Sequence, residues 1–398
     1  MSLRQVYIVA AKRTPFGTFG GKLRSLSAAE LGGLAAKAVV SSLPANTPIS
    51  STIMGNVLHT DTAGAYLARH IGHRAGLPFE VPALTVNRLC GSGFQSVVNG
   101  VHEILLGESE IVLAGGAENM SKAPYVVDGD KTRWGTRYGV DLKMEDSLSA
   151  VLVDQYPNPT PMGITSENLA SKYNITREQC DEFALLSQQR YAKAASQGIF
   201  EREIVPVEVK GKKGPETVSV DEHPRPQSTA ESLAKLKPVF KRDGGVTTAG
   251  NASGINDGAA AIIIASEEAV NKYGLTPLAR IVSWQSSGVD PSIMGIGPVP
   301  AIQGALKRAN LGLDQMDLIE VNEAFAAQYL AVEKELGLDR SKTNRNGGAI
   351  AIGHPLGASG ARILTHLTHE LQRTNSKLAI GSACIGGGQG IAVVLERV

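Results

Sequence analysis

The chain has 398 residues, of which 42% are hydrophobic and 19% are charged, a composition typical of a folded protein with two or three domains. Its 39 Lys and Arg side chains nearly balance 38 Asp and Glu, so net charge gives no reason to expect nucleic acid or an anionic membrane as a partner. No apolar run approaches the roughly 18 residues needed to span a bilayer, so we expect no integral membrane segment. The 3 cysteines are too few and too scattered for a disulfide framework or a cysteine zinc site, which favours a reducing compartment.

The N-terminal part of the chain alternates short apolar strands with segments of helical period. Strands that alternate with helices favour a largely parallel sheet covered on both faces. From about residue 124 to 245 the sequence becomes charged and contains prolines, with its clearest helix at 177–198, so we interpret it as an insertion. In the N-terminal part we expect strands at 6–10, 52–57, 83–86 and 110–114 and helices at 28–43, 66–76 and after Cys90.

A second alternating set follows the insertion, after core-like sequence at 246–250 and 259–265. We expect strands at 278–282, 317–321 and 378–382, with helices opened by Pro298 and Asn322 and after His354. In each set a strand ends at a reactive residue, Cys90 or His354, then Gly and Ser follow, a helix begins and a strand returns. This weak duplication predicts two similar α/β halves whose helix N-termini meet at a shared boundary.

Cys90 lies in the stretch 87–96, Asn-Arg-Leu-Cys-Gly-Ser-Gly-Phe-Gln-Ser, just before apolar residues of helical spacing. A cysteine at a helix N-terminus has its thiolate stabilised by the helix dipole and by free backbone N–H groups, so we expect a lowered pKa. Gly91 and Gly93 would let a ligand approach this backbone closely. Taken alone, the stretch fits a buried, inert cysteine equally well.

His354, Cys384 and Asn322 are the other candidates for chemistry. His354 precedes a proline, which favours an extended position at a strand end, where it could act as a base or donor, although a core histidine is the alternative. Cys384 lies in a glycine-dense turn whose N–H groups could bind an oxyanion, although a plain hairpin needs fewer glycines. Asn322 follows a strand and opens a helix, so it could be only an N-cap.

Other patterns argue for no metal and no nucleotide cofactor. His366, His369 and Glu370 have a helical spacing that could hold a metal, but a solvated helix face is the simpler interpretation. The chain contains no Walker A motif, and no strand is followed by the three-glycine dinucleotide fingerprint. Phosphoryl or hydride transfer that depends on a nucleotide is therefore disfavoured.

Taken together, four stretches resemble the catalytic loops of the thiolase family in their order. The resemblance runs from about Val6 to Leu395, and stretches 11–17 and 290–300 are most similar to the branch of 3-ketoacyl-CoA thiolases of mitochondrial fatty-acid β-oxidation. It implies a five-layer αβαβα fold of two similar halves and a tetramer built from tight dimers. It also implies an N-terminal domain of residues 1–271, with a loop domain inserted at about 121–246, and a C-terminal domain of residues 272–398. The four loops are residues 87–93, 322–325, 346–360 and 382–388.

The resemblance also implies roles for the candidate residues. Cys90 would be the nucleophile that becomes acylated, His354 would activate it, and Cys384 would carry a proton to and from the acetyl-CoA carbon or the incoming thiol. Asn322 would position a water that shares one oxyanion hole with His354, while the backbone N–H groups of Cys90 and Gly386 would form the other.

Further residues would contact coenzyme A and the substrate. Coenzyme A is here a substrate, and no other cofactor is implied. An arginine near the phosphates of coenzyme A has a physical reason, because the rest of the protein is nearly neutral. The contacts implied by matching positions are Arg225, Ser228, Ser253, Met294 and Phe325.

The activity implied is cleavage of a 3-oxoacyl-CoA by coenzyme A to an acyl-CoA and acetyl-CoA, through acylated Cys90. Residues 161–163 read Pro-Met-Gly where acetoacetyl-CoA-specific thiolases have His-Met-Gly, which disfavours a short-chain-only enzyme. A biosynthetic acetoacetyl-CoA thiolase (acetyl-CoA C-acetyltransferase) remains the alternative, and a non-catalytic acyl-CoA-binding protein on the same fold is a third.

The N-terminal stretch bears on location. Residues 1–29 contain basic residues and no acidic one, as mitochondrial import segments do. Because this stretch includes the first expected core strand, we expect a matrix protein whose import signal is not cleaved. A basic surface on a cytoplasmic protein is the alternative.

Overall fold

A ten-stranded mixed sheet runs through the computed structural model, which describes residues 4–211 and 214–398. Its strands follow the order β14-β15-β16-β13-β1-β12-β5-β3-β4, and the short β2 pairs with β12. The strands are β1 Val6–Arg13, β2 Gly17–Thr18, β3 Ser51–Gly55, β4 Ala83–Val86, β5 Ile111–Asn119, β12 Asn256–Ser266, β13 Ala279–Gly288, β14 Leu318–Val321, β15 Leu378–Ile385 and β16 Gln389–Arg397.

The sheet consists of two similar halves that meet where β1 pairs with β13 in antiparallel register. Within each half a parallel group, β4-β3-β5 or β14-β15, is followed by antiparallel neighbours, β12 and β1 or β16 and β13. The prediction of a largely parallel sheet is therefore wrong. The strand β12 enters the sheet from the long insertion, and the turn between β15 and β16 is too short for the crossover that parallel strands require.

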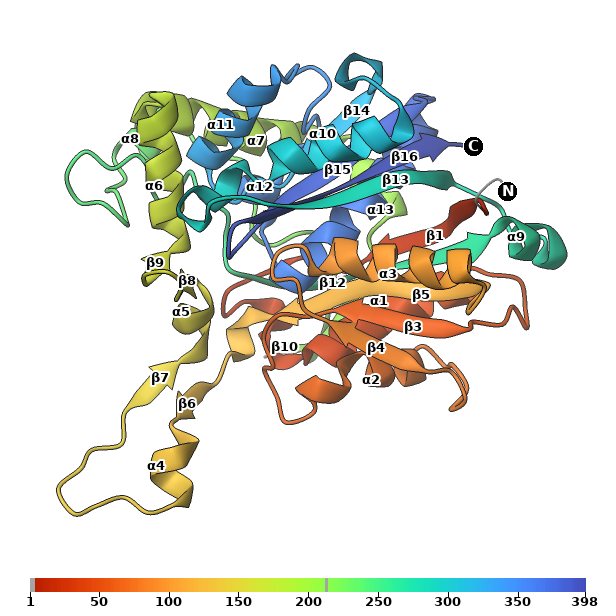
Figure 1. Cartoon of the computed structure of the whole chain (residues 1–398), viewed down its shortest axis with the longest axis horizontal. Coiled ribbons are helices and arrows are strands. Elements are labelled where there is room, and N and C mark those ends of the chain that lie inside the picture. Colours follow the sequence, from red (N-terminus) through yellow and green to blue (C-terminus); the bar gives the residue numbers. More distant parts are fainter. Residues whose placement is uncertain (1–3, 212–213) are drawn as a thin grey trace.

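Helices cover the sheet and also fill its middle, which gives five layers of helices and strands (Figure 1). The outer layers are α1 and α2 on one side and α10 and α11 on the other, while α3 and α13 lie between the two halves of the sheet. The five-layer αβαβα prediction is thus confirmed. These helices are α1 Ala28–Ser41, α2 Leu67–Arg74, α3 Ser92–Leu106, α10 Pro298–Ala309, α11 Ala326–Leu336 and α13 Leu356–Thr374.

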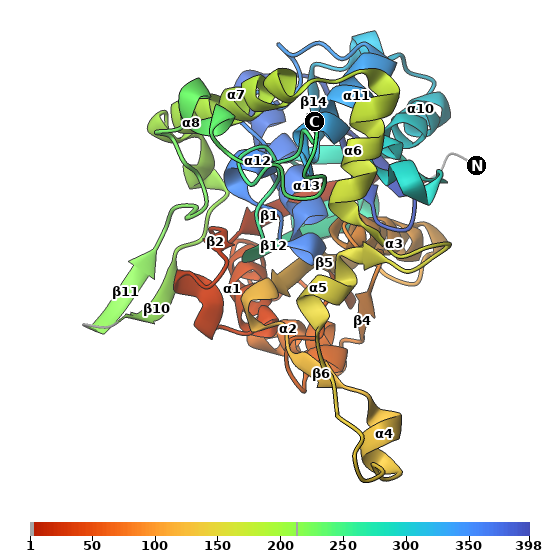
Figure 2. The ribbon, with the colours of Figure 1, turned by 90° about the vertical axis from the view of Figure 1, so that its left-hand side faces the viewer.

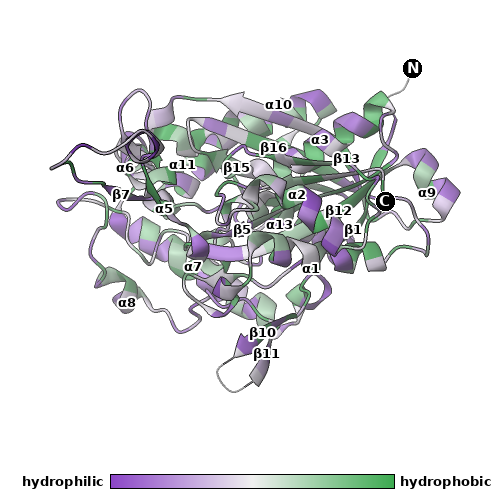
Figure 3. Cartoon of the chain, turned by 90° about the horizontal axis from the view of Figure 1, so that it is seen from below, coloured by the Kyte–Doolittle hydropathy of each residue, from purple (hydrophilic) through white to green (hydrophobic). Residues whose placement is uncertain are grey.

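The two central helices meet at their N-terminal ends, as the duplication predicted. Gly93 of α3 faces the backbone of Ala361, and Gly360 of α13 faces the backbone of Phe94. A Cβ atom at Gly93 would lie 2.6 Å from the Ala361 nitrogen, so glycine is required for this approach. Further along, Phe94 and Ile363 are fully buried, and burial of each such side chain stabilises the fold by about 1.5–3 kcal/mol. Figure 3 shows the hydrophobic strands that enclose this layer.

Residues 120–234 hold elements whose strands pair only with one another, as β6–β7, β8–β9 and β10–β11. Two of these pairs project from the body: the arm that carries α4 (Figure 1) and the β10–β11 hairpin (Figure 2). The bounds are η3 Met120–Lys122, β6 Tyr125–Val127, α4 Gly129–Arg133, β7 Met144–Asp146, α5 Ser147–Val151, β8 Val153–Asp154, β9 Thr160–Pro161, α6 Met162–Tyr173, α7 Arg177–Ser196, η4 Ile199–Arg202, β10 Val207–Gly211, β11 Gly214–Val218 and α8 Ala230–Ala234.

Two local predictions near the candidate site are corrected. The segment before His354 is the short helix α12, Ala349–Ile352, and not a strand. Asn322 follows β14, but α11 begins only at Ala326, so Asn322 is not an N-cap. Within the described chain, no helix has both the length and the apolar character needed to cross a bilayer. The remaining elements are η1 Lys22–Ser25, η2 Gly64–Tyr66, α9 Glu267–Tyr273, η5 Pro291–Ile296 and η6 Leu313–Gln315.

Candidate active site

A predominantly apolar cavity of about 320 Å³ lies where the two halves of the sheet and the insertion meet. Both halves supply reactive groups to it, and the insertion supplies apolar walls such as Met162 and Phe240. Of the residues predicted from the sequence, six line this cavity: Cys90, His354, Cys384, Ser253, Met294 and Phe325.

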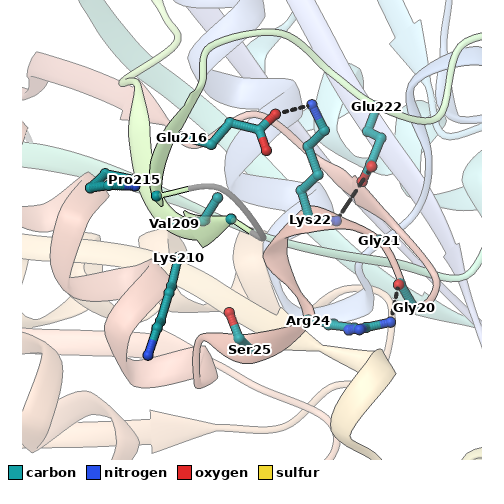
Figure 4. Close-up of a pocket in the computed structure, with 12 residues that line it drawn as sticks. Gly20, Gly21, Lys22, Arg24, Ser25, Val209, Lys210, Pro215, Glu216 and Glu222 are labelled. Carbon is teal, nitrogen blue, oxygen red and sulfur yellow. Dashed lines mark hydrogen bonds and ion pairs between the residues drawn. The ribbon is translucent and has the colours of Figure 1, made fainter.

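A larger hollow of about 760 Å³ lies elsewhere, between η1 and the β10–β11 hairpin (Figure 4). Its charged groups largely satisfy one another: the Lys22 ammonium binds Glu216, and Glu222 accepts from the Lys22 backbone N–H. None of the predicted catalytic residues lines it. The smaller apolar cavity is therefore the candidate active site.

Local hydrogen bonds hold the turn that presents Cys90. The Asn87 side chain accepts from the Leu89 N–H at 2.9 Å, and the Ser92 hydroxyl donates to the Leu89 carbonyl oxygen at 2.6 Å. Between them Leu89 has a φ of +46°, a conformation that costs a non-glycine residue on the order of 1–3 kcal/mol. The turn ends at Gly91, the N-cap of α3, so Cys90 directly precedes the helix. The predicted position of Cys90 is confirmed.

The expected low pKa of Cys90 is wrong. Burial raises the pKa of this thiol to about 11, although the backbone N–H groups of Gly386 and of Cys90 itself favour the thiolate. The apolar wall around the sulfur outweighs the helix N-terminus, because desolvation penalises the charged form. Cys90 is therefore a thiol at neutral pH and needs a base to become a nucleophile.

His354 faces the same cavity and is fixed by two hydrogen bonds. Its backbone N–H donates to Asn256 Oδ1 at 3.0 Å, and its Nδ1 lies 2.6 Å from the Ser359 hydroxyl. The preceding Gly353 has a φ of +106° and packs against the Asn256 side chain, so a Cβ atom there would be both strained and obstructed. The backbone conformation at Gly353 therefore sets the direction of the imidazole, and not a strand end as predicted.

The Ser359 hydroxyl determines which imidazole nitrogen is basic. It donates its proton to the Pro355 carbonyl oxygen at 2.9 Å, so it accepts from His354 Nδ1–H. The proton on Nδ1 leaves Nε2 as the acceptor nitrogen, 3.4 Å from Asn322 Nδ2. Burial, together with the charge of Arg362, lowers the pKa of His354 to about 4, so the imidazole is neutral and can accept a proton.

Cys384 lies near the end of β15, opposite Gly390 of β16, and is fully buried. Burial raises the pKa of its thiol, and the neighbouring Cys90 sulfur raises it further. Both cysteines line the same cavity. The surroundings of Cys384, Met294 and Ala324, are apolar. The thiolate of Cys384 is therefore strongly basic, which would suit a group that carries a proton. The third cysteine, Cys180, is buried in the core on α7 and does not line the cavity.

Asn322 lies beside His354, as predicted. Its Nδ2 is 3.4 Å from His354 Nε2, and its Oδ1 is buried with no hydrogen-bond partner among the described residues. A buried acceptor without a partner is energetically costly unless a ligand or water satisfies it. The unpaired Oδ1 therefore suits the binding of a water or another polar group beside the imidazole.

Two predicted coenzyme A contacts lie outside the cavity wall. Arg225 is exposed, with its backbone N–H bound to Gln188 Oε1 at 2.8 Å, and Ser228 donates its hydroxyl proton to the Arg225 carbonyl oxygen. The structure does not bring either one into the lining of the cavity. Ser253 does line the cavity, and its backbone N–H donates to the Ala324 carbonyl oxygen at 2.9 Å.

Sequence reasoning missed Asn256, Ser359 and Glu118. Asn256 reaches His354 across 98 residues of sequence, so no local pattern reveals it. Glu118 is buried below the site, where it accepts from the backbone N–H groups of Val57 and Gly357 and so ties together the loops of the two halves. The signal for Ser359 was its position five residues after the histidine, near the start of the next helix.

The predicted solvated face at His366 and His369 is wrong. His366 is buried, with Nδ1 2.8 Å from Glu203 Oε2 and Nε2 3.0 Å from Asn346 Nδ2. His369 bonds the Ala11 carbonyl oxygen. Both side chains are therefore structural. The described residues contain no group of His, Cys, Asp and Glu that could hold a metal ion.

Two halves with matching loops, a thiol, a neutral imidazole and a second thiol in one apolar cavity are suited to acyl transfer. Comparison with known proteins agrees with this chemistry. The model "Thiolase, N-terminal domain" matches residues 6–268, and "Thiolase, C-terminal domain" matches residues 275–397.

Full-length relatives are also found. The chain is 61% identical over 395 residues to "3-ketoacyl-CoA thiolase, mitochondrial" of Homo sapiens, which covers 99% of this chain and 98% of the relative. It superposes on the crystal structure of human mitochondrial 3-ketoacyl-CoA thiolase with a TM-score of 0.97, 60% identity and 100% coverage of both chains. A structure of the human thiolase in complex with CoA has a TM-score of 0.96 and 60% identity, with 99% of this chain and 98% of that one covered. The chain therefore belongs to the thiolase family.

Proposed function

We propose that the chain is a 3-ketoacyl-CoA thiolase of fatty-acid β-oxidation, an acyltransferase that cleaves a 3-oxoacyl-CoA with coenzyme A. The observation that carries the proposal is the meeting of Cys90, His354 and Cys384 in one apolar cavity. The human relative with 61% identity, named a mitochondrial 3-ketoacyl-CoA thiolase, supports the same substrate class.

In the first half-reaction His354 Nε2 accepts the Cys90 proton, and the sulfur attacks the C3 carbonyl carbon of the substrate. The oxyanion that forms next to the sulfur is stabilised by the N–H groups of Gly386 and Cys90, which already point at this sulfur. The bond between C2 and C3 then breaks, leaving acyl-Cys90 and the enolate of acetyl-CoA. Asn322 and His354 hold the enolate oxygen, with a water bound to Asn322, and Cys384 donates its proton to C2.

The second half-reaction restores the enzyme. The Cys384 thiolate accepts the proton of incoming coenzyme A, and the coenzyme sulfur attacks the Cys90 thioester. The same two N–H groups stabilise the tetrahedral oxyanion, and the Cys90 thiolate leaves and recovers a proton from His354. A strongly basic Cys384 thiolate suits both its tasks, because it protonates a carbanion and deprotonates a thiol.

We propose acyl chains longer than acetoacetyl as substrates. Support comes from the apolar cavity walls, including Met162, Leu152 and Phe240, and from Pro161 in place of a pocket histidine. A biosynthetic acetoacetyl-CoA thiolase is the alternative. For the coenzyme we propose Arg225, Ser228 and Ser253 as contacts, from their matching positions in the family's motifs. The related structure in complex with CoA supports coenzyme A as the ligand. An exposed cation near the cavity suits the phosphates of coenzyme A.

We also propose a homotetramer with the predicted domains, residues 1–271 with an insertion at about 121–246 and residues 272–398. Support for the insertion comes from its strands, which pair only among themselves. Support for assembly comes from exposed apolar side chains on the β6–β7 arm, such as Trp134, and from β4, an uncovered edge strand of the sheet. For location we propose the mitochondrial matrix, supported by the mitochondrial relatives, with the basic N-terminal stretch as a retained signal.

A chain-length series tests the proposed function. The kcat/KM for thiolysis is measured on 3-oxoacyl-CoAs from acetoacetyl-CoA upward, and we expect longer substrates to be cleaved at least as efficiently as acetoacetyl-CoA. A rate confined to acetoacetyl-CoA would favour the biosynthetic alternative. A protein that binds acyl-CoA but releases no burst of coenzyme A would instead be the non-catalytic binding protein.

A further inference from the structure

A basic hollow of about 360 Å³ lies between the C-terminal half of α7, the loop at 340–346 and the end of α13. Of the described residues that line it, none is acidic. The chain as a whole has a formal net charge of only +1, so this concentration of cations is local. The basic residues of the hollow are Arg190, Lys193, Arg340, Arg345 and Arg373.

Two of these cations form ion pairs with carboxylates that do not line the hollow. Arg340 forms two hydrogen bonds with Glu333, at 2.7 and 2.8 Å, and Arg373 forms two with Glu370, at 2.6 and 2.7 Å. These pairs fix both guanidinium groups at the rim and leave little net charge there.

Arg190 is held differently, by neutral groups alone. Its guanidinium donates to the carbonyl oxygens of Arg340, Thr343 and Asn344 at 2.6, 2.8 and 3.2 Å. Three of its five donors are thereby used, the positive charge is not neutralised, and two donors remain. Burial lowers the pKa of Arg190 and the nearby Arg340 lowers it further, which outweighs the opposite effect of the more distant carboxylates of Glu323 and Glu333.

Lys193 and Arg345 complete the set. Both side chains are exposed and form no hydrogen bond or ion pair with another described residue. The backbone beside Arg345 is rigid, because the neighbouring Asn344 side chain pairs with both the N–H and the carbonyl of Val321 at 2.9 Å. Three cations of the hollow, Arg190, Lys193 and Arg345, thus form no direct ion pair with a carboxylate of the described chain.

We propose that this basic hollow binds a small polyphosphate, a chain of two or three phosphoryl groups, either free or on a nucleotide. Three cations without a direct ion pair around so small a volume favour a ligand that carries several negative charges in a short length. Arginine matches phosphate oxygens with paired donors, and the volume falls in the range of small-molecule sites. Neither the catalytic cavity nor the hollow shares a lining residue with the other, and none of the proposed coenzyme A contacts, Arg225, Ser228 and Ser253, lines the hollow, so this site is separate from them.

Calorimetric titration with inorganic triphosphate near physiological salt tests the proposal. The double variant Lys193→Gln/Arg345→Gln should bind triphosphate at least about tenfold more weakly, since each lost side chain removes a charge-assisted hydrogen bond. Both side chains are exposed, so the variant should fold. The matched control Lys37→Gln/Arg308→Gln removes the same net charge from exposed helical positions elsewhere and should leave the affinity within about twofold.

A third variant separates this site from the proposed coenzyme A site. Arg225→Gln should keep its affinity for triphosphate, because Arg225 does not line the basic hollow. The proposal would be overturned if Arg225→Gln lost its affinity for triphosphate while the double variant kept it. An equal loss of affinity in the matched control, or no binding of triphosphate by the wild type, would also overturn it. Competition by ATP would extend the ligand to nucleotides, whereas its absence would restrict it to free polyphosphate, and either result is consistent with the site.

Discussion

Cys90 and Cys384 open onto the same cavity, but their surroundings differ and suit different tasks. Cys90 precedes α3, with the Gly386 N–H directed at its sulfur, so an oxyanion formed beside this sulfur finds donors in place. Cys384 lies in β15 among apolar side chains, where a thiol holds its proton firmly. The first arrangement suits a covalent intermediate, and the second suits proton transfer.

This division of labour predicts how single variants behave. Cys384→Ser should still become acylated at Cys90 from a preformed acyl-CoA donor but lose about 10²- to 10⁴-fold in thiolysis, because general acid–base help is removed. Cys90→Ala should lose both acylation and thiolysis. Cys180→Ala changes a residue in the core and should lose neither activity. The measurement is single-turnover acylation by mass spectrometry beside steady-state thiolysis. If Cys384→Ser failed to become acylated but kept near-normal thiolysis, the roles assigned to Cys90 and Cys384 would be reversed.

The buried imidazole predicts an unusual pH profile. Because the pKa of His354 is lowered to about 4, its Nε2 stays unprotonated well below the ordinary histidine range. Acylation of Cys90 should therefore keep a nearly constant rate from pH 7 to about pH 5 and fall only as pH approaches 4, where the base becomes protonated. Stopped-flow acylation after a pH jump, with circular dichroism to confirm the fold, measures this. An acid limb centred near pH 6.5 would contradict a desolvated His354.

The sequence could supply the reactive residues because each lies in a short, distinctive loop. It could not supply Asn256 or Glu118, which reach the site through the folded chain. The predicted low pKa of Cys90 failed for a related reason. A helix N-terminus is visible in a sequence, whereas the apolar wall that desolvates the sulfur is assembled from distant segments.

At the scale of elements, buried ionic contacts join the two halves to the insertion. Arg13 of β1 binds Glu203 at 2.7 Å and Asp221 at 2.6 Å, and His366 of α13 binds the second oxygen of Glu203. Burial opposes the charge on His366, but the facing Glu203 carboxylate outweighs it and raises the pKa of this histidine. The same histidine and Arg13 hold the pKa of Glu203 well below its usual range, against the effect of burial.

These contacts predict a pH-dependent stability. His366 has a raised pKa in the folded state, so its contribution is complete below about pH 6.5, the unfolded value, and is lost as pH rises through the folded pKa. Urea unfolding from pH 6 to 9 should show this loss in the wild type but not in His366→Gln. At pH 6 that variant should be less stable by up to about 3–5 kcal/mol, the range for breaking a buried pair. If the stability of His366→Gln depended on pH as the wild type does, the prediction would be contradicted. The variant His59→Gln, at an exposed position, is the control.

Long periodic helices were predictable within a few residues, as α7 shows, with Arg177–Ser196 found where 177–198 was expected. The helix α12 was not, because its four residues, Ala349–Ile352, are too few to display a helical period. Strand direction was not predictable either. A fully buried strand such as β12 is a continuous apolar run whether its neighbours are parallel or antiparallel.

At the scale of the whole molecule, the pairing of β1 with β13 makes one sheet of two halves, and the cavity lies where their loops converge. The arm formed by β6, α4 and β7 extends away from this body (Figure 1). Its side chains Trp134 and Tyr138 are 81% and 107% exposed, although aromatic groups are normally sheltered from water. We propose that this arm packs against another copy of the chain.

Charged substitutions on the arm should therefore lower the oligomeric state. We expect Trp134→Asp/Tyr138→Asp to sediment as a smaller species than the wild type, for which we propose a tetramer, because a carboxylate in an apolar interface is strongly unfavourable. Analytical ultracentrifugation across a concentration series measures this. The control Val220→Asp, an exposed apolar position outside the arm, should leave the assembly unchanged. A tetramer that survives both arm substitutions would place the interface elsewhere.

The central claim is that the acyl group is carried by Cys90 after His354 has taken its proton. The most direct measurement is peptide mass spectrometry of the protein after brief incubation with an acyl-CoA and no acceptor thiol. We predict that the acyl mass appears on the peptide that contains Cys90, and that His354→Ala slows its appearance. Acyl mass on Cys384 or Cys180, with Cys90 unmodified, would contradict the account.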